Sequence, residues 1–150
     1  MQTFLPYPDF RASAACLDPQ RLRKQRAEVV QLLTALDDPS DRNYNHPATK
    51  MWRGFRDALV DYGIAICLEL MDRGEQDNTI EKIRRQRSTE LGSVPYPKWL
   101  GRESFHASHR GNLMRKNPDW YRLFHWTDSP MLPYEWPVNH DPRLFRFQVK

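Results

Sequence analysis

The sequence predicts a mainly α protein: a single compact domain of about four to five helices, with an extended N-terminus and a Pro- and aromatic-rich C-terminal tail. Apolar residues recur every three or four positions along several segments, and no segment alternates apolar and polar residues over the length of a strand. The 12 prolines gather between these segments, while glycine, with 6 residues, is scarce. A chain of 150 residues has the size of one domain.

The first long helix is expected over residues 18–36. Asp18 is a favoured N-cap, and Pro19 fits the first helical turn because it lacks only a backbone donor that would be unpaired there. Leucine and valine recur behind them at helical spacing, and an acidic run beginning at Asp37 ends the segment.

A continuous helix of about 27 residues is expected to begin at His46 and to end at Arg73-Gly74, where a basic residue and a glycine are typical of a helix C-terminus. An apolar residue stands at every third or fourth position from 51 to 70. We expect this helix to form the centre of the core.

The remaining helices are shorter. One is expected over residues 78–91, with Glu81 completing a capping box. The prolines within 95–97 exclude a helix there. A further helix is expected over 102–116, and a last helical turn begins at Pro118. The chain is thus divided into a helical domain, residues 1–126, and an extended tail, residues 127–150, packed on the same domain.

Composition excludes several classes. No apolar run approaches the roughly 18 residues of a membrane span, and the N-terminus lacks the basic and apolar pattern of a signal peptide. Cys16 and Cys67 are too few for a disulfide framework or a cysteine-based zinc site. We therefore expect a cytoplasmic monomer with no membrane partner. The net charge of +4 is too small to identify a partner by itself.

The positions of the charges are more informative than their sum. Basic residues concentrate in three runs, within 21–26, 82–87 and 98–116, while acids concentrate elsewhere. Glu28 is the one acid close to the first run. It is either part of a solvated helix face, paired with Lys24, or a single carboxylate inside a surface that binds phosphates. The residues alone favour a helical, basic-faced, nucleic-acid-binding protein.

No motif predicts a metal or cofactor. His106 and His109 have a spacing compatible with a metal, but no cysteine or carboxylate follows in a zinc pattern. Gly-rich phosphate loops, Gly-x-Ser-x-Gly elbows and His-Glu-x-x-His helices are absent from the sequence. We expect no metal site and no cofactor.

Several segments, in this order, carry a resemblance to a known family. They are an Asp–Gln–basic–Leu pattern at 18–22 that leads to Glu28, the segment 46–74 with its His start and Arg-Gly end, Ser108 to Arg110 with Leu113, and Pro118-x-Trp120-Tyr121. The chain resembles the pyrimidine-dimer DNA glycosylases, the group typified by phage endonuclease V. It is most similar to a bacterial branch whose members begin Thr-Phe-Leu-Pro-Tyr-Pro.

The resemblance implies a cofactor-free DNA repair enzyme that removes a damaged or modified pyrimidine, foremost a pyrimidine dimer, from double-stranded DNA. Such enzymes attack C1′ with the N-terminal α-amine and form an imine, and β-elimination (AP lyase activity) then nicks the strand. By resemblance Glu28 is the catalytic carboxylate. Gln2 is too large for removal of the initiator methionine, so the amine of Met1 takes the place of the nucleophile.

The DNA-contacting residues expected from the basic helices are Arg21, Lys24, Gln25, Arg26, Arg110, Arg115 and Lys116, and His46 and His109 are further site candidates. Three alternatives stay open. A purely hydrolytic glycosylase would use water activated by Glu28 on another modified base. A non-catalytic DNA- or RNA-binding protein would keep only the basic face. An interaction adaptor would use the aromatic tail around Trp136.

Overall fold

The computed structural model describes residues 1–88 and 94–138, and within these ranges it contains helices and turns but no β-strand. The mainly α prediction is confirmed. The described residues form seven α-helices rather than four to five, followed by one 3-10 turn. The elements are α1 (Phe10–Cys16), α2 (Pro19–Asp37), α3 (Pro47–Lys50), α4 (Arg56–Asp72), α5 (Ile80–Arg84), α6 (Glu103–Lys116), α7 (Pro118–Tyr121) and the 3-10 turn η1 (Arg122–Phe124).

Side-chain caps mark the first residues of α2 and α7, two helix starts that the sequence predicted. Asp18 caps α2, and its carboxylate accepts from the backbone N–H of Arg21 at 3.4 Å. Asn117 caps α7 in the same way, accepting from the N–H of Trp120 at 3.2 Å. The expected positions of α2, α6 and α7 are each confirmed to within one residue at the ends that were predicted.

The prediction of one continuous central helix is wrong, because a turn at residues 51–55 separates α3 from α4. Gly54 has a φ of 87°, a left-handed conformation that breaks a right-handed helix and that glycine adopts without steric cost. The two outer ends were predicted. His46 Nδ1 accepts from the N–H of Ala48 at 3.0 Å to cap α3, and Gly74 follows α4 with a φ of 89°.

Two short helices differ from expectation. α1 occupies part of the N-terminus expected to be extended, and Asp9 caps it by accepting from the N–H groups of Arg11 and Ala12 at 2.8 and 3.1 Å. α5 lacks the expected capping box, because the N–H of Ile80 donates to Asp77 at 2.7 Å. It ends at Arg84, and residues 89–93 lie outside the described residues.

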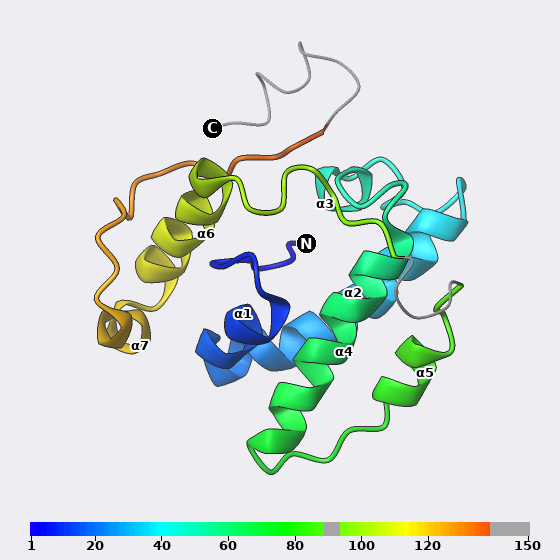
Figure 1. Cartoon of the computed structure of the whole chain (residues 1–150), viewed down its shortest axis with the longest axis horizontal. Coiled ribbons are helices and arrows are strands. Elements are labelled where there is room, and N and C mark those ends of the chain that lie inside the picture. The colour runs from blue at the N-terminus through cyan, green and yellow to red at the C-terminus, as the bar shows by residue number, and fades with distance from the viewer. Residues whose placement is uncertain (89–93, 139–150) are drawn as a thin grey trace.

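α2 and α4 pack against each other more extensively than any other pair of helices in the described residues. The fully buried Val29 of α2 lies against Gly63 of α4, where a Cβ would come within 2.7 Å of a Val29 methyl carbon. Glycine at this position therefore permits the close approach of the two helices. Figure 1 shows the N-terminus of the chain near the middle of the fold, between these helices and α6.

Residues 127–138 form an extended segment beside α6, as predicted for the tail (Figure 1). Asn112 donates to the Leu132 carbonyl at 2.9 Å, and the N–H of Glu135 donates to the Ser108 hydroxyl at 3.1 Å. Residues 139–150 lie outside the described residues, and the division of the chain at 126/127 stays a prediction. In the described ranges, no helix combines the length and apolar character needed to cross a bilayer.

Gly111 of α6 gives a test of this packing. A Cβ there would lie 2.3 Å from the Ser129 carbonyl oxygen, so the tail backbone must move away from α6 in Gly111→Ala. We expect a loss of about 1–3 kcal/mol in the free energy of unfolding, measured by urea titration. Helix propensity alone predicts the opposite sign, a gain of about 1 kcal/mol. A stabilised variant would therefore contradict the contact.

Candidate functional site

The first six residues run through the core, and buried side chains of several helices bind their backbone groups. Gln25 of α2 makes the central contacts. Its Nε2 donates to the Gln2 carbonyl at 2.7 Å, and its Oε1 accepts from the N–H of Phe4 at 3.0 Å. The hydroxyl of Tyr62 in α4 lies within donating distance of Gln25 Oε1 (2.6 Å) and of the Phe4 carbonyl (2.8 Å).

Gln25 also connects the N-terminal segment to Glu28. The same Nε2 donates to Glu28 Oε2 at 2.8 Å, so the amide nitrogen is shared between the carboxylate and the Gln2 carbonyl. Glu28 is only 8 % exposed, which excludes the solvated-face interpretation of this residue. The amide thus sets the position of the carboxylate relative to the start of the chain.

Two histidines of α6 bind the segment from the other side. His109 Nδ1 accepts from the N–H of Leu5 at 2.9 Å. His106 Nε2 accepts from the N–H of Gly101 at 2.9 Å, so its Nδ1 carries the proton and donates to the Leu5 carbonyl at 2.7 Å. Burial lowers the pKa of both histidines, that of His109 to about 3, and keeps them neutral.

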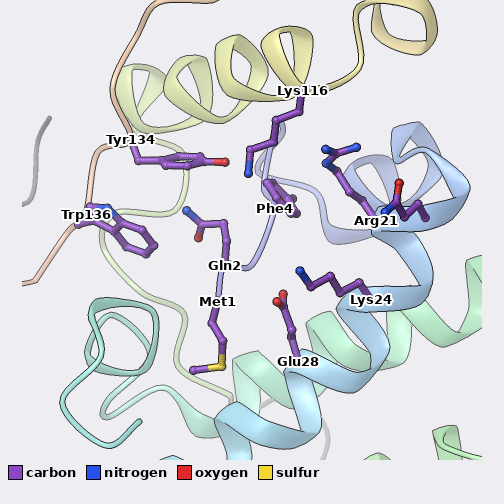
Figure 2. Close-up of a pocket in the computed structure, with 10 residues that line it drawn as sticks. Met1, Gln2, Phe4, Arg21, Lys24, Glu28, Lys116, Tyr134 and Trp136 are labelled. Carbon is purple, nitrogen blue, oxygen red and sulfur yellow. The ribbon is translucent and has the colours of Figure 1, made fainter.

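This segment delivers the start of the chain to a cavity of about 220 Å³. Figure 2 shows the lining side chains converging from the N-terminus, α2, α6 and the tail. The lining residues are Met1, Gln2, Phe4, Gln20, Arg21, Lys24, Glu28, Lys116, Tyr134 and Trp136. The pocket therefore holds one acidic side chain among three basic ones.

The cations act on one another across this pocket. Burial lowers the pKa of Lys116, and the positive charges of Arg21, Arg115 and Lys24 lower it further, while Glu28 opposes the shift. The ammonium of Lys116 lies 5.3 Å from the centroid of the Phe4 ring, close enough for a cation–π contact. A positive pocket with a buried carboxylate suits an anionic ligand whose reaction develops positive charge.

His46 is close enough to the amino terminus to respond to its charge. Burial lowers the pKa of His46, and the positive charge of the N-terminal amine lowers it further. Its ring stands edge-on to Trp136, with centroids 6.1 Å apart. His46 thus caps α3 and contacts Trp136, which lines the pocket, although His46 does not line it.

The structure brings together five of the predicted site residues, Met1, Arg21, Lys24, Glu28 and Lys116. Arg115 lies next to them on α6 and donates to the Pro130 carbonyl at 3.2 Å. Arg26 instead pairs with Asp77 at 3.0 Å, and it does not line the pocket.

Three other predicted site residues are buried and bonded within the protein. Gln25 is fully buried, and the N-terminal segment, Tyr62 and Glu28 occupy its amide. His109 is fully buried against the same segment. Arg110 has a side chain only 11 % exposed. We therefore leave Gln25 and Arg110 out of the proposed DNA-contacting set, and His109 out of the candidate site.

Arg110 is held by acids on both sides. Its Nε donates to Asp128 at 2.7 Å, it pairs with Glu103, and its Nη1 donates to the Pro6 carbonyl at 2.8 Å. Burial lowers the pKa of this guanidinium, but the hydrogen bonds and charges of the two carboxylates outweigh burial and raise it. The residue joins α6, the tail and the N-terminal segment.

Much of the predicted basic surface is likewise paired. Arginines of all three basic runs pair with acids distant in sequence or one helical turn away. These pairs are Arg21–Asp18, Arg23–Glu75, Arg26–Asp77, Arg84–Glu81, Arg87–Asp61, Arg102–Glu135 and Arg110–Asp128. By contrast, Lys24 and Lys116 form no ion pair within residues 1–88 and 94–138, which leaves the pocket positive.

Sequence reasoning missed half of the pocket lining. Gln2 was considered only for methionine retention and Trp136 only as part of an adaptor surface. Phe4 and Gln20 entered only as members of the family patterns, and Tyr134 was not considered. Only the fold brings 134 and 136 beside residues 1–28, so no local pattern marks them. No group of three metal-binding side chains converges in the part of the chain that the structure describes.

Comparison with known proteins bears on this site. A family model described as "Pyrimidine dimer DNA glycosylase" matches residues 1–82, more than half of the 150-residue chain. The match includes Met1, Arg21, Lys24 and Glu28 but ends before α6 and the tail. No curated protein and no solved structure matches the chain.

The buried histidines predict a pH dependence of stability. The pKa of His109 is lowered to about 3 in the folded protein, so the unfolded chain binds its proton first as the pH falls. This contribution to stability is complete above pH ~6.5 and declines below it, by about 2 kcal/mol at pH 5. His109→Gln keeps an acceptor for the Leu5 N–H but cannot titrate. In urea titrations from pH 7 to 5 it should lose less stability than the unaltered protein, and equal slopes would contradict the neutral buried imidazole.

Proposed function

Since the chain belongs to the pyrimidine dimer DNA glycosylase family, we propose that its pocket removes a damaged or modified pyrimidine, foremost a dimer base, from duplex DNA. The observation that carries this proposal is the placement of a buried carboxylate, Glu28, in one cavity with the start of the chain. Arg21, Lys24 and Lys116 around it supply the positive charge that DNA phosphates require.

The proposed chemistry begins with the Met1 amine. Its lone pair forms a bond to C1′ of the damaged nucleotide, the glycosidic C–N bond breaks, and the bonding pair leaves with the base, which takes up a proton. The sugar ring opens to an imine. Loss of a C2′ proton then expels the 3′ phosphate by β-elimination, which nicks the strand. Glu28 stabilises the cationic sugar and imine through its negative charge and moves these protons.

Several contacts support Met1 as the nucleophile. The segment that carries it is fixed by Gln25 and Tyr62, so the amine has a defined position before DNA binds. Preorganisation of this kind lowers the entropic cost of the attack. The bond from Gln25 to Glu28 orders the carboxylate by the same side chain.

The hydrolytic alternative uses the same pocket. Water activated by Glu28 would attack C1′ and release the base with no covalent intermediate. A DNA-binding protein without catalysis is the alternative from another class, since the positive pocket would bind phosphates in either case.

The first test separates these mechanisms. With UV-irradiated duplex DNA and borohydride, we expect a covalent adduct whose attachment maps to Met1 by peptide mass spectrometry. Blocking the α-amine should abolish it. Lys24→Arg and Lys116→Arg are the matched controls, because each removes one of the two lysine amines that line the pocket but keeps the charge.

The outcomes are distinct. An adduct on Lys24 or Lys116 contradicts the assignment of Met1. Base release without an adduct favours hydrolysis. Neither base release nor an adduct on dimer, abasic and modified-base duplexes leaves the binding-protein alternative.

A second prediction concerns the carboxylate. Glu28→Gln keeps the size of the side chain and an acceptor for Gln25 Nε2 but removes the charge. We expect base release to fall by about 10²–10⁴-fold, while the affinity for duplex DNA is kept or rises slightly. Single-turnover kinetics and a binding titration measure the two effects. Unchanged turnover would remove Glu28 from the reaction.

A further inference from the structure

Residues 42–53 carry three cations and no acid. Arg42 lies in the loop before α3, Lys50 is the last residue of α3, and Arg53 lies in the turn that follows. In the part of the chain that the structure describes, none of the three forms an ion pair, in contrast to most arginines of the three basic runs. This stretch is therefore a further positive group, and it lies outside the runs from which DNA contacts were predicted.

The acids that precede this stretch are bonded to their own neighbours. Asp38 accepts from the N–H and the hydroxyl of Ser40 at 2.9 and 2.7 Å, and these bonds lower the pKa of its carboxyl. Asp41 accepts from the N–H of Asn43 at 2.7 Å. These carboxylates hold the turns of the loop and do not pair with the three cations.

Tyr44 holds Arg53 in a defined orientation. Arg53 Nη2 donates to the Tyr44 carbonyl at 2.6 Å, and the guanidinium carbon lies 4.1 Å from the centroid of the Tyr44 ring. Both residues are partly exposed. A guanidinium stacked on a ring keeps its N–H donors in its own plane, in the fork that matches phosphate oxygens. Because the side chain is already ordered, an anion that binds it causes little further loss of entropy.

The stretch that contains α3 borders the pocket on the side away from α6. His46, the cap of α3, stands edge-on to Trp136 of the pocket with centroids 6.1 Å apart. Figure 1 shows α3 and α6 on opposite sides of the N-terminus. Figure 2 shows Trp136 between the helix that carries Lys116 and the loop around α3. Positive charge is therefore present on two sides of one pocket.

We propose that Arg42, Lys50 and Arg53 bind the phosphates of duplex DNA on the side of the pocket opposite to α6. A duplex whose damaged nucleotide lies at the pocket continues past both of its edges, and its phosphates repeat along the whole length. Contacts to phosphates carry no sequence information, but they fix the position and the orientation of the duplex. Cations on both sides thus hold the DNA at two places with the reacting nucleotide between them.

This inference rests on the proposed function and adds a second DNA-binding surface to it. Its test therefore uses binding alone, with a duplex that carries a tetrahydrofuran abasic analogue and cannot react. Each phosphate contact contributes about 0.9 to the slope of log affinity against log salt concentration. The slope reports the number of phosphates bound, which a loss of folded protein does not change.

Arg53→Gln should lower the magnitude of this slope by about one contact, so the drop in affinity between about 50 and 200 mM salt becomes about 3.5-fold smaller. Lys50→Gln and Arg42→Gln should each do the same. Arg53→Lys keeps the charge without the planar fork, and it should restore most of the slope. Arg56→Gln is the matched control: it lies three residues away and changes the net charge equally, but Arg56 already pairs with Asp37 at 2.9 Å. Its slope should equal that of the unaltered protein.

Neutral methylphosphonate linkages locate the contact. Placed on one side of the analogue at a time, they should weaken binding by the unaltered protein on both sides. On the side that Arg53 binds, Arg53→Gln should lose less affinity than the unaltered protein, because the charge that the phosphate meets is already absent.

An unchanged slope in Arg42→Gln, Lys50→Gln and Arg53→Gln overturns the second surface. An equal fall in Arg56→Gln also overturns it, since net charge alone would then explain the effect. The proposed function fails in a different way: the unaltered protein releases no base from any damaged duplex, while the slope still falls in Arg53→Gln.

Discussion

The fold depends on hydrogen bonds that satisfy the backbone of its buried N-terminal segment. Burying an extended segment removes its N–H and C=O groups from water, and each must find a partner inside the protein. Gln25 meets this need at Gln2 and Phe4, and His106 and His109 meet it at Leu5. These three side chains thus make the hydrogen bonds that a neighbouring strand would make to an extended segment in a β-sheet. Because Gln25 Nε2 donates to both the Gln2 carbonyl and Glu28, one amide holds the N-terminal segment and positions the pocket carboxylate.

The electrostatics follow from the same burial. Arg110 binds the Pro6 carbonyl, and two acids surround it because a buried cation requires compensation. Arg26 and Arg102 are likewise paired, so the surplus of basic residues in the sequence does not spread evenly over the surface. Lys24 and Lys116 of the pocket form no ion pair within residues 1–88 and 94–138, so Glu28 is the acid that faces them in the pocket lining.

Local features of the fold could be predicted from the sequence, and features that depend on distant segments could not. Asp18 and Pro19 predicted the start of α2 because capping is local, acting over three or four residues. The apolar stripe continued through Gly54, so its periodicity did not reveal the break between α3 and α4. The assignment of Glu28 as the catalytic carboxylate rests on a resemblance and stays a prediction. The burial of Gln25 was not foreseen, because it depends on where the N-terminal segment lies in the fold.

The pocket combines two parts of the chain, the N-terminal segment with α2 and the tail beside α6. The amine and the carboxylate come from the segment that the family model matches, while the aromatic wall comes from the tail. The tail reaches the pocket by lying against α6, where Gly111 leaves room for the Ser129 carbonyl. A side chain at this position would displace the backbone that leads to Tyr134 and Trp136. The pocket wall that Tyr134 and Trp136 form therefore depends on how closely the tail can approach a helix that lacks a Cβ at one position, while Met1 and Glu28 come from the other part of the chain.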